Sequence, residues 1–269
     1  MLDVDTLCRF LDDFAPAQLA EAWDNVGLLV GHRERPVRNV MTCLTITPAS
    51  LAEAVESQVD LIVTHHPLPF RALKRITGDT VVGRLLLSLA EARIAVYSPH
   101  TAFDSAAAGI NQRLADGLQL TEVRPLVAKC DSQGVGGDEA NVLGAGRFGR
   151  LSPALPWDEF AARVKRFVHV DRLQVVPANR AIERVAVACG SAGEMLEPAL
   201  QAGCNALVMG ETNFHTCLEA EARGIGLVLT GHFASERFGV EHLAVVLQQR
   251  FPEVTVWASR READPLRWL

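Results

Sequence analysis

Two adjacent histidines, His65 and His66, end an apolar segment and are followed by a proline. The segment before them, Leu61 to Thr64, has the apolar run and flanking turn signals of a buried strand. Ligands usually bind at the carboxyl end of such a strand in an α/β sheet. Because Pro67 restricts His66 to an extended or turn conformation, both imidazoles can converge on one pocket. The pair indicates a site for two metal ions, and the alternative is two partly exposed histidines at a strand end.

Further side chains able to bind metals or move protons follow other expected strand ends, namely His100, Asp104, His215, His232 and Glu236. His100 with Asp104, and His232 with Glu236, are each four residues apart, a spacing that puts both side chains on one face of a helical turn. Imidazoles mixed with carboxylates suit Zn, Fe, Mn, Co or Ni. A carboxylate that bridges two ions about 3.5 to 4 Å apart is typical of two-metal hydrolases. The set therefore predicts a dinuclear metal centre.

Some members of this set also have simpler interpretations. Asp104 stands where it could cap a helix that begins at Ser105. Glu236 could be a first-turn acid favoured by the dipole of the last helix. His215 has Glu211 as its one supporting neighbour at helical spacing, which favours a supporting position over a metal ligand.

The elements that must position these residues recur in the chain. When Val40 is placed on Val185, a pattern of strand, helix and strand repeats at an offset of 145 residues. Farther along, SPHTAFD at 98–104 aligns with TGHFASE at 230–236. This alignment places His100 on His232 and Asp104 on Glu236. The alternation of strands and helices implies parallel strands covered by helices. We infer an internal duplication that gives two similar lobes related by an approximate dyad.

We therefore expect an α/β fold of three layers, α/β/α. Residues 1–120 together with 231–269 would form the first lobe, with most of the metal ligands. Residues 121–230 would form the second lobe, including a glycine-rich insert at 121–180. The segment WDNVGLLVG at 23–31 is expected to be loop and turn.

The insert contains a GxGxxG pattern formed by Gly144, Gly146 and Gly149. A dinucleotide site needs a helix that starts within the glycine loop, so that its N-terminus meets the pyrophosphate. Because Pro153 and Pro156 postpone the next helix, a glycine-rich turn is the better interpretation. Cys189, which precedes Gly190, is interpreted as a buried cysteine beside a tight turn rather than as a nucleophile.

Composition limits the classes of function. Of 269 residues, 26 are basic and 32 are acidic, which gives a formal charge of −6. Because the sequence contains no run of basic residues to neutralise phosphates, we do not expect general nucleic-acid binding. No segment reaches the roughly 18 to 20 apolar residues of a membrane span. The N-terminus is acidic and amphipathic, unlike a secretory signal. The six cysteines are scattered without a CxxC pair. A cytoplasmic protein with reduced cysteines is expected.

Several motifs together resemble one known family. They are DNVGLLVG at 24–31, THHPLPF at 64–70, SPHTAFD at 98–104, GE at 210–211 and GHFASE at 231–236. In this order, over essentially the whole chain, they resemble the Nif-three-like proteins, known also as GTP cyclohydrolase I type 2 homologues. The resemblance implies two intertwined α/β lobes and a toroidal homohexamer built as a trimer of dimers.

The resemblance also implies two divalent metal ions per chain. The ligands carried over by motif are His65, His66, Asp104, His232 and Glu236. His100 then becomes a near neighbour of the ions. In the family the first repeat's strand commonly reads LDxTP, whereas here it reads LTITP at 44–48, so that Thr45 replaces an acid. If that acid orients an imidazole or the substrate in relatives, this chain differs from them in activity.

The expected function is metal-dependent hydrolysis of a nucleotide, a pterin precursor or a phosphoester by water activated at the metals. His100 and His215 are candidate proton carriers, because their side chains are expected near the site without being needed as ligands. Arg71, Lys74 and Arg75 would meet a substrate phosphate, or else form a solvated face. GTP cyclohydrolase activity rests on the resemblance alone, since no residues that read guanine are identified. The alternatives are a metal storage or delivery protein and a regulatory hexameric scaffold.

Overall fold

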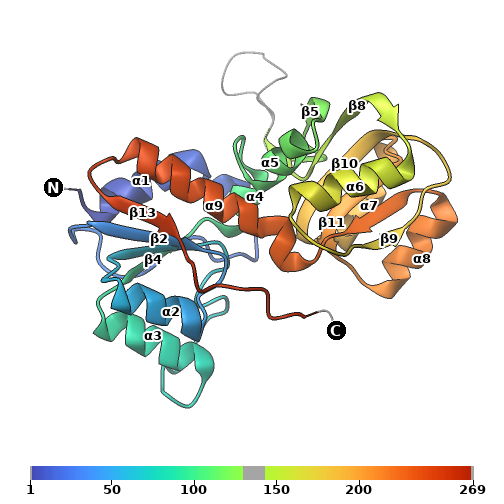
Figure 1. Ribbon diagram of the computed structural model, residues 1–269. Helices are drawn as coiled ribbons and strands as arrows, with labels where there is room; N and C mark the ends of the chain where they lie inside the picture. Colours follow the sequence, from blue (N-terminus) through green and yellow to red (C-terminus); the bar gives the residue numbers. More distant parts are fainter. Residues whose placement is uncertain (1, 130–142, 268–269) are drawn as a thin grey trace. The chain divides into compact units, whose positions relative to one another are not determined.

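The computed structural model describes residues 2–129 and 143–267 and shows a mixed α/β fold (Figure 1). The chain forms two compact units, Met1–Phe103 with Gly239–Leu269, and Asp104–Phe238. The expected lobes had boundaries at 120 and 230. Residues 104–120 and 231–238, which were expected in the first lobe, belong to the second unit. The turn-rich segment at 130–142 lies outside the described residues.

The first unit is built on a five-stranded sheet with the order β1-β4-β3-β2-β13. Strands β4, β3, β2 and β13 run parallel, with Val40 opposite Leu61 and Leu61 opposite Ala95. The edge strand β1 pairs antiparallel with β4. β3 is buried at every position, which fits its apolar sequence. The strands are β1 Gly27–Val30, β2 Asn39–Cys43, β3 Leu61–Thr64, β4 Ala95–Ser98 and β13 Thr255–Ala258.

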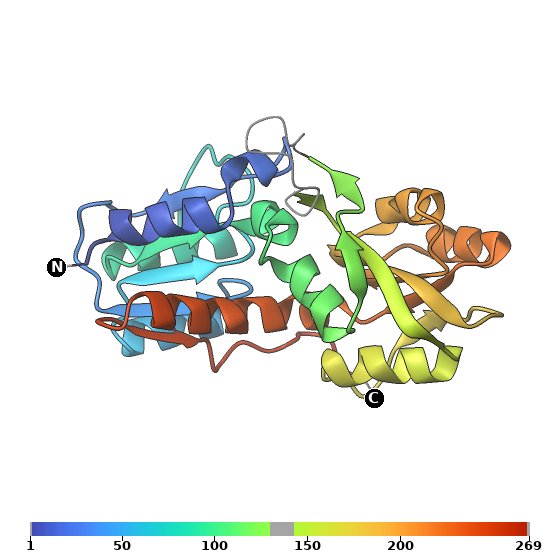
Figure 2. The same cartoon turned by 90° about the horizontal axis from the view of Figure 1, so that it is seen from above.

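Helices cover both faces of this sheet. α2 and α3 lie on one face, where Leu51 and Leu89 pack with Met41 and Ile62 in a shared core (Figure 1). α1 and α9, blue and red in Figure 2, lie alongside each other on the other face. Thr47 caps α2, and its hydroxyl accepts from the amide of Ser50. The helices are α1 Val4–Phe14, α2 Pro48–Glu56, α3 Val81–Glu91 and α9 His232–Arg250.

The second unit has a six-stranded sheet with the order β5-β8-β10-β11-β12-β9. β10, β11 and β12 are parallel, and the strands on either side of them are antiparallel to their neighbours. A small two-stranded sheet joins β6 and β7. The strands are β5 Thr121–Arg124, β6 Val127–Ala128, β7 Gly144–Ala145, β8 Arg147–Leu155, β9 Gln174–Val176, β10 Ile182–Ser191, β11 Ala206–Glu211 and β12 Gly226–Leu229.

Alternate residues of β10 enter two separate cores. Val185 and Val187 pack with α5 and α6, whereas Ala186 and Ala188 pack with α7 and α8. This period of two is the geometry of a strand with helices on both faces, so this unit also has three layers. The helices of this unit are α5 Ile110–Gly117, α6 Trp157–Phe167, α7 Leu196–Gln201 and α8 Phe214–Arg223, with the short 3-10 turn η3 Gly193–Met195. The 3-10 turn η1 Ala17–Leu19 belongs to the first unit, and α4 His100–Ser105 spans the boundary between the units.

The repeat inferred from the sequence appears in both sheets. β2, α2 and β3 have the same order and parallel pairing as β10, α7 and β11. Each copy continues with a further parallel strand, β4 or β12, and then a helix that begins at a histidine, His100 or His232.

Two local predictions have definite outcomes. The segment 23–31 is not entirely loop, because Gly27–Val30 forms β1 against the edge of β4. The glycine pattern leads into β8 rather than a helix, and Gly146 has a positive φ of 60°, as in a turn. The interpretation against a dinucleotide fingerprint is therefore confirmed.

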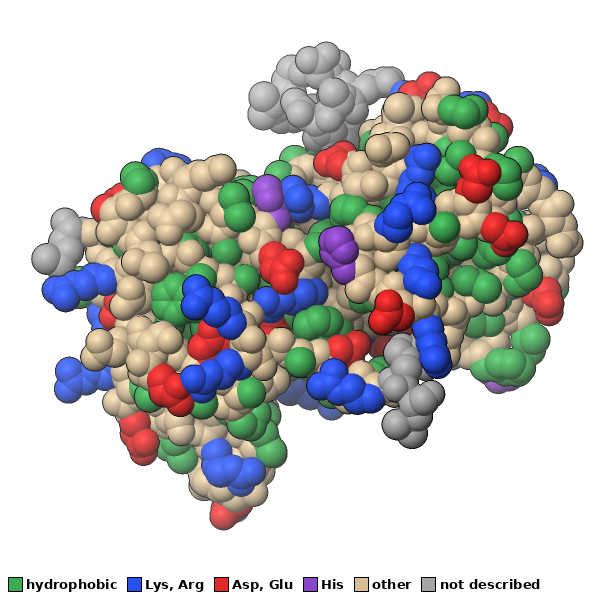
Figure 3. Space-filling model, in the orientation of Figure 1, with side chains coloured by type: hydrophobic (Ala, Val, Ile, Leu, Met, Phe, Trp, Pro, Cys, Tyr) green, Lys and Arg blue, Asp and Glu red, His purple; other side chains and the backbone are tan. Residues whose placement is uncertain are grey.

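Acidic and basic side chains are interspersed over the described surface visible in Figure 3. Among the helices of residues 2–129 and 143–267, none combines the length and apolarity required to cross a bilayer. The described cysteines are all free thiols; Cys8, Cys43, Cys189 and Cys204 are buried.

Candidate metal centre

The two histidines at the end of β3 are held by backbone hydrogen bonds that continue the pairing with β2. The amide of His65 donates to Cys43 O at 3.0 Å, and the amide of His66 donates to Leu44 O at 2.8 Å. The Ser98 hydroxyl donates to His65 O at 2.6 Å. The His65 side chain is buried, with 1% exposure. Both residues are thus fixed at the carboxyl end of a parallel strand, as predicted.

His100 begins α4 directly after β4 and reaches the same edge of the sheet. Its φ of 28° lies in the left-handed region that non-glycine residues rarely adopt. Nδ1 of His100 lies 2.6 Å from Asp24 Oδ1, and the Asp24 side chain is fully buried. Burial by itself would raise the pKa of Asp24, but hydrogen bonds from His100 and Thr101 outweigh it and lower the pKa to about 2. An ionised carboxylate therefore holds this imidazole.

The three imidazoles form one cluster in the first unit. One nitrogen from each of His65, His66 and His100 lies within 4.8 Å of the other two. The ring of His65 is 5.0 Å from that of His66 and 5.1 Å from that of His100, centroid to centroid. His100, which was not predicted to be a ligand, therefore lies as close to His65 and His66 as these two predicted ligands lie to each other.

Thr45, which stands where the resemblance leads one to expect an acid, contacts His66. The Thr45 hydroxyl lies 2.7 Å from Nδ1 of His66. The backbone at Thr45 is held in turn by Glu262, whose carboxylate accepts from the amides of Leu44 and Thr45 at 2.8 and 2.6 Å. A neutral hydroxyl therefore orients this imidazole.

In the second unit, Asp104 lies near the end of α4 beside Cys189. Cys189 Sγ donates to Asp104 Oδ1 at 3.1 Å. Burial raises the pKa of the Cys189 thiol well above its ordinary value, and the charges of Asp104 and Glu236 add to that effect. The next helix begins at Ile110 with Gly109 as its N-cap, so Asp104 does not cap a helix at Ser105. Cys189 is a buried thiol, not an activated nucleophile.

His232 and Glu236 face each other across the first turn of α9. His232 Nε2 lies 3.2 Å from Glu236 Oε2, and His232 Nδ1 lies 3.0 Å from Glu211 Oε1. The hydrogen bond with Glu236, together with the smaller contribution of Glu211, raises the pKa of His232 to about 9 against the effect of burial. This imidazole is thus set between two carboxylates.

The close packing around Glu236 requires a glycine at 190. A Cβ added to Gly190 would lie 2.5 Å from Glu236 Oε1, and Gly190 has a positive φ of 67°. The amide of Gly190 also donates to Ser235 Oγ at 2.9 Å. The end of β10 therefore packs directly against the first turn of α9.

The contact recorded for His215 is with an aromatic ring and not with these carboxylates. It is exposed on α8, and its ring contacts Phe214 at 5.9 Å between centroids. Glu211, its expected neighbour, is paired with His232 instead. Arg71, Lys74 and Arg75 are exposed in the segment that follows His66.

Comparison with known proteins agrees with this arrangement of motifs. The family model described as Duf34/NIF3 (NGG1p interacting factor 3) matches residues 2–265. The chain belongs to the Duf34/NIF3 family. It is 33% identical to a GTP cyclohydrolase 1 type 2 homolog of Clostridium acetobutylicum, over 99% of both chains. It is 30% identical to NIF3-like protein 1 of Drosophila melanogaster, over 95% of this chain and 86% of that one.

A solved structure shares the Duf34/NIF3 fold. It is a Bacillus cereus protein related to NIF3, with a TM-score of 0.89 and 21% identity, and the likeness covers 100% of this chain and 99% of that one. At that identity the likeness shows the fold alone. The family resemblance read from the motifs is confirmed.

The donors present in this Duf34/NIF3 chain fit divalent metal ions. Imidazole nitrogens and carboxylate oxygens are ligands for Zn, Fe, Mn, Co and Ni. Histidines that bind metals commonly hydrogen-bond a carboxylate or another acceptor through their second nitrogen. His100 with Asp24 and His66 with Thr45 have this arrangement.

Two residues of the site, Asp24 and Glu262, were not predicted from the sequence of this Duf34/NIF3 chain. Asp24 is part of the DNVGLLVG motif, which could have marked it, but its partner His100 is 76 residues away. Glu262 carries no signal in the sequence, since it lies in an irregular C-terminal segment and contacts the backbone after β2. Both act through pairings that depend on the folded sheet.

Proposed function

We propose that this chain is a dinuclear metal-dependent hydrolase that acts on a nucleotide or another phosphoester. The observation that carries the proposal is the cluster of His65, His66 and His100, in which a buried carboxylate orients one ring and a hydroxyl another. A single buried imidazole is a common structural residue, whereas three at one strand edge with positioned partners suit metal binding. The names of the curated relatives as GTP cyclohydrolase 1 type 2 homologs also support the class of reaction.

The proposed ligands are those implied by the family resemblance. They are His65, His66, Asp104, His232 and Glu236, and they would hold two divalent ions per chain. When bound, such a pair of ions would lower the pKa of water and stabilise developing negative charge. Glu211 orients His232 through Nδ1, and Thr45 orients His66 in the same way.

The protein itself would supply a proton carrier. His100 is the better candidate, because its ring lies beside the other two imidazoles and Asp24 holds it in one orientation. Asp24 is a positioning residue in this proposal, since it would act through His100. A proton-carrying role for His215 stays a prediction, and the exposed position of its side chain gives it less support.

The test measures metal content per chain and hydrolysis on the same preparation. The full-length protein is purified without added metal and screened on nucleotides and phosphoesters before and after chelation. Two tightly held ions with turnover that is lost on chelation and restored by metal support the hydrolase. Ions that exchange readily, with no turnover on any substrate, overturn it and favour metal storage or delivery.

We also propose that the chain assembles as a homohexamer, as the family resemblance implies. Light scattering coupled to size exclusion would give a mass of about six chains of 29.2 kDa each. A monomer or dimer at all concentrations would contradict this assembly without affecting the proposed chemistry.

A further inference from the structure

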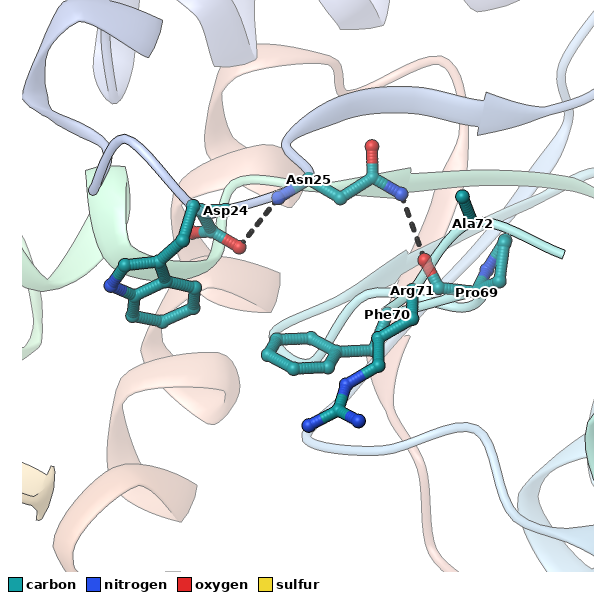
Figure 4. A pocket seen from close by; sticks show the side chains of 7 residues that line it. Asp24, Asn25, Pro69, Phe70, Arg71 and Ala72 are labelled. Carbon is teal, nitrogen blue, oxygen red and sulfur yellow. Dashed lines mark hydrogen bonds between the residues drawn. The ribbon is translucent and has the colours of Figure 1, made fainter.

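A pocket of about 750 Å³ opens in the first unit beside the histidine cluster. One wall is Trp23, Asp24 and Asn25, and the other is the segment from Pro69 to Ala72 (Figure 4). Asn25 Nδ2 donates to Pro69 O at 2.8 Å, and the amide of Asn25 donates to Asp24 Oδ1 at 2.7 Å. The two walls are therefore tied together, and the pocket is formed before any ligand arrives.

Two aromatic rings of this pocket are largely exposed. Trp23 is 62% exposed and Phe70 is 46% exposed. Their centroids lie 5.9 Å apart, and the rings meet edge to face at 63°. A ligand ring has no room to insert between them, but it can stack on the exposed face of one ring while its edge meets the other. Adjacent exposed aromatic side chains of this kind suit a planar ring system.

The aromatic wall continues directly to the histidine cluster. The ring centroid of His100 lies 6.1 Å from that of Trp23 and 6.0 Å from that of Phe70. Asp24 lines the pocket and also holds Nδ1 of His100. A molecule stacked in the pocket would thus place its adjoining atoms next to His100.

The charge in the pocket favours an anion. Arg71 lines the pocket and is exposed, and Figure 4 shows its guanidinium extending toward the same side as the Phe70 ring. Among the described lining residues the one carboxylate is Asp24, which is engaged by His100 and Thr101. The guanidinium of Arg71 is therefore the charge that an incoming group would meet, and its planar donors suit a phosphate.

We propose that this pocket binds a substrate in which an aromatic ring system is joined to a phosphate. Trp23 and Phe70 would stack the ring, and Arg71 would pair with the phosphate. The place of this binding step in catalysis rests on the proposed hydrolase function, but the binding itself does not. The pocket thus supplies the substrate selection for which the sequence shows no motif.

The experiment measures binding of adenosine 5′-monophosphate to the full-length protein by calorimetry, with and without chelator. Adenosine, which lacks the phosphate, and ribose 5-phosphate, which lacks the base, are the matched probes. We expect the nucleotide to bind at least tenfold more tightly than either. Trp23→Leu should weaken nucleotide binding about 10-fold to 100-fold, the effect of one stacked base, and leave ribose 5-phosphate unchanged.

Arg71→Gln should weaken binding of the nucleotide and of ribose 5-phosphate but not of adenosine. Phe214→Leu is the matched control, because Phe214 is 71% exposed on α8 and does not line the pocket. Phe70→Leu gives a second aromatic variant if Trp23→Leu fails to fold, as judged by circular dichroism.

The proposal is overturned if the nucleotide binds no more tightly than ribose 5-phosphate, or if both aromatic variants bind it as well as the parent protein. This outcome is distinct from failure of the hydrolase proposal. Nucleotide binding that depends on Trp23 in a protein without turnover would support the pocket and contradict the enzyme. Turnover with an unchanged KM in Trp23→Leu would support the enzyme and contradict the pocket.

Discussion

The hydroxyl of Thr45 lies 2.7 Å from Nδ1 of His66. This contact joins the end of β2 to the end of β3, and Glu262 fixes its backbone from the C-terminal segment. Thr45 is thus a positioning residue for a proposed metal ligand. A hydroxyl can donate or accept, whereas a carboxylate would hold the imidazole more strongly.

Thr45→Val should lower metal affinity about 10-fold to 100-fold, because it keeps the shape of the side chain and removes its hydrogen bond to His66. Thr45→Asp should bind metal at least as tightly as the parent chain, because a carboxylate can also accept a hydrogen bond from His66. Competition with a chromogenic chelator measures both variants. Equal affinities in all three proteins would show that the contact does not orient the imidazole.

His66→Ala and Glu236→Ala should each abolish metal loading without unfolding the protein, because each removes a proposed ligand. Elemental analysis gives the ions per chain, and circular dichroism checks the fold. His215→Ala is the control, since His215 is exposed on α8 and should keep its full metal content. A variant of His66 or Glu236 that retains two ions per chain would refute the ligand assignment.

Cys189→Ser should retain any hydrolytic activity within about twofold, because the buried thiol donates to Asp104 and a hydroxyl can replace it as donor. The raised pKa of the Cys189 thiol also predicts slow alkylation at neutral pH. Mass spectrometry after iodoacetamide treatment should find Cys217, which is partly exposed, modified before Cys189. Complete loss of turnover in Cys189→Ser would revive a nucleophilic role.

Asp24→Asn should reduce the free energy of unfolding by about 2 kcal/mol at pH 7, from a folded-state pKa of about 2 against an ordinary 3.8. Because the folded pKa is lowered, this stabilisation is present above about pH 3.8 and is lost as the pH falls through about 2. The difference between the two proteins in urea unfolding should therefore be constant from pH 7 to 5 and shrink toward pH 3. A difference that stays constant down to pH 3 would contradict the ionised state of Asp24.

Local sequence signals determined much of the framework. Thr47 with Pro48 predicts the start of α2, and the apolar run before His65 predicts β3 and the edge at which the histidines lie. These signals succeed because capping and burial on both faces of a parallel strand act over a few residues. The short strand β1 is missed because Gly27 within it and Gly31 after it resemble turn residues, and the strand forms only by pairing with β4.

The sequence by itself determined the family, the parallel strands of both repeats and the residue types available for metal binding. The tertiary structure alone decided which side chains orient those residues. His100 meets Asp24, and His66 meets Thr45, across 76 and 21 residues of chain. The pocket beside them joins Trp23 to Phe70 in the same way. Such contacts arise because the sheet brings distant strand ends to one edge, which no local pattern of residues encodes.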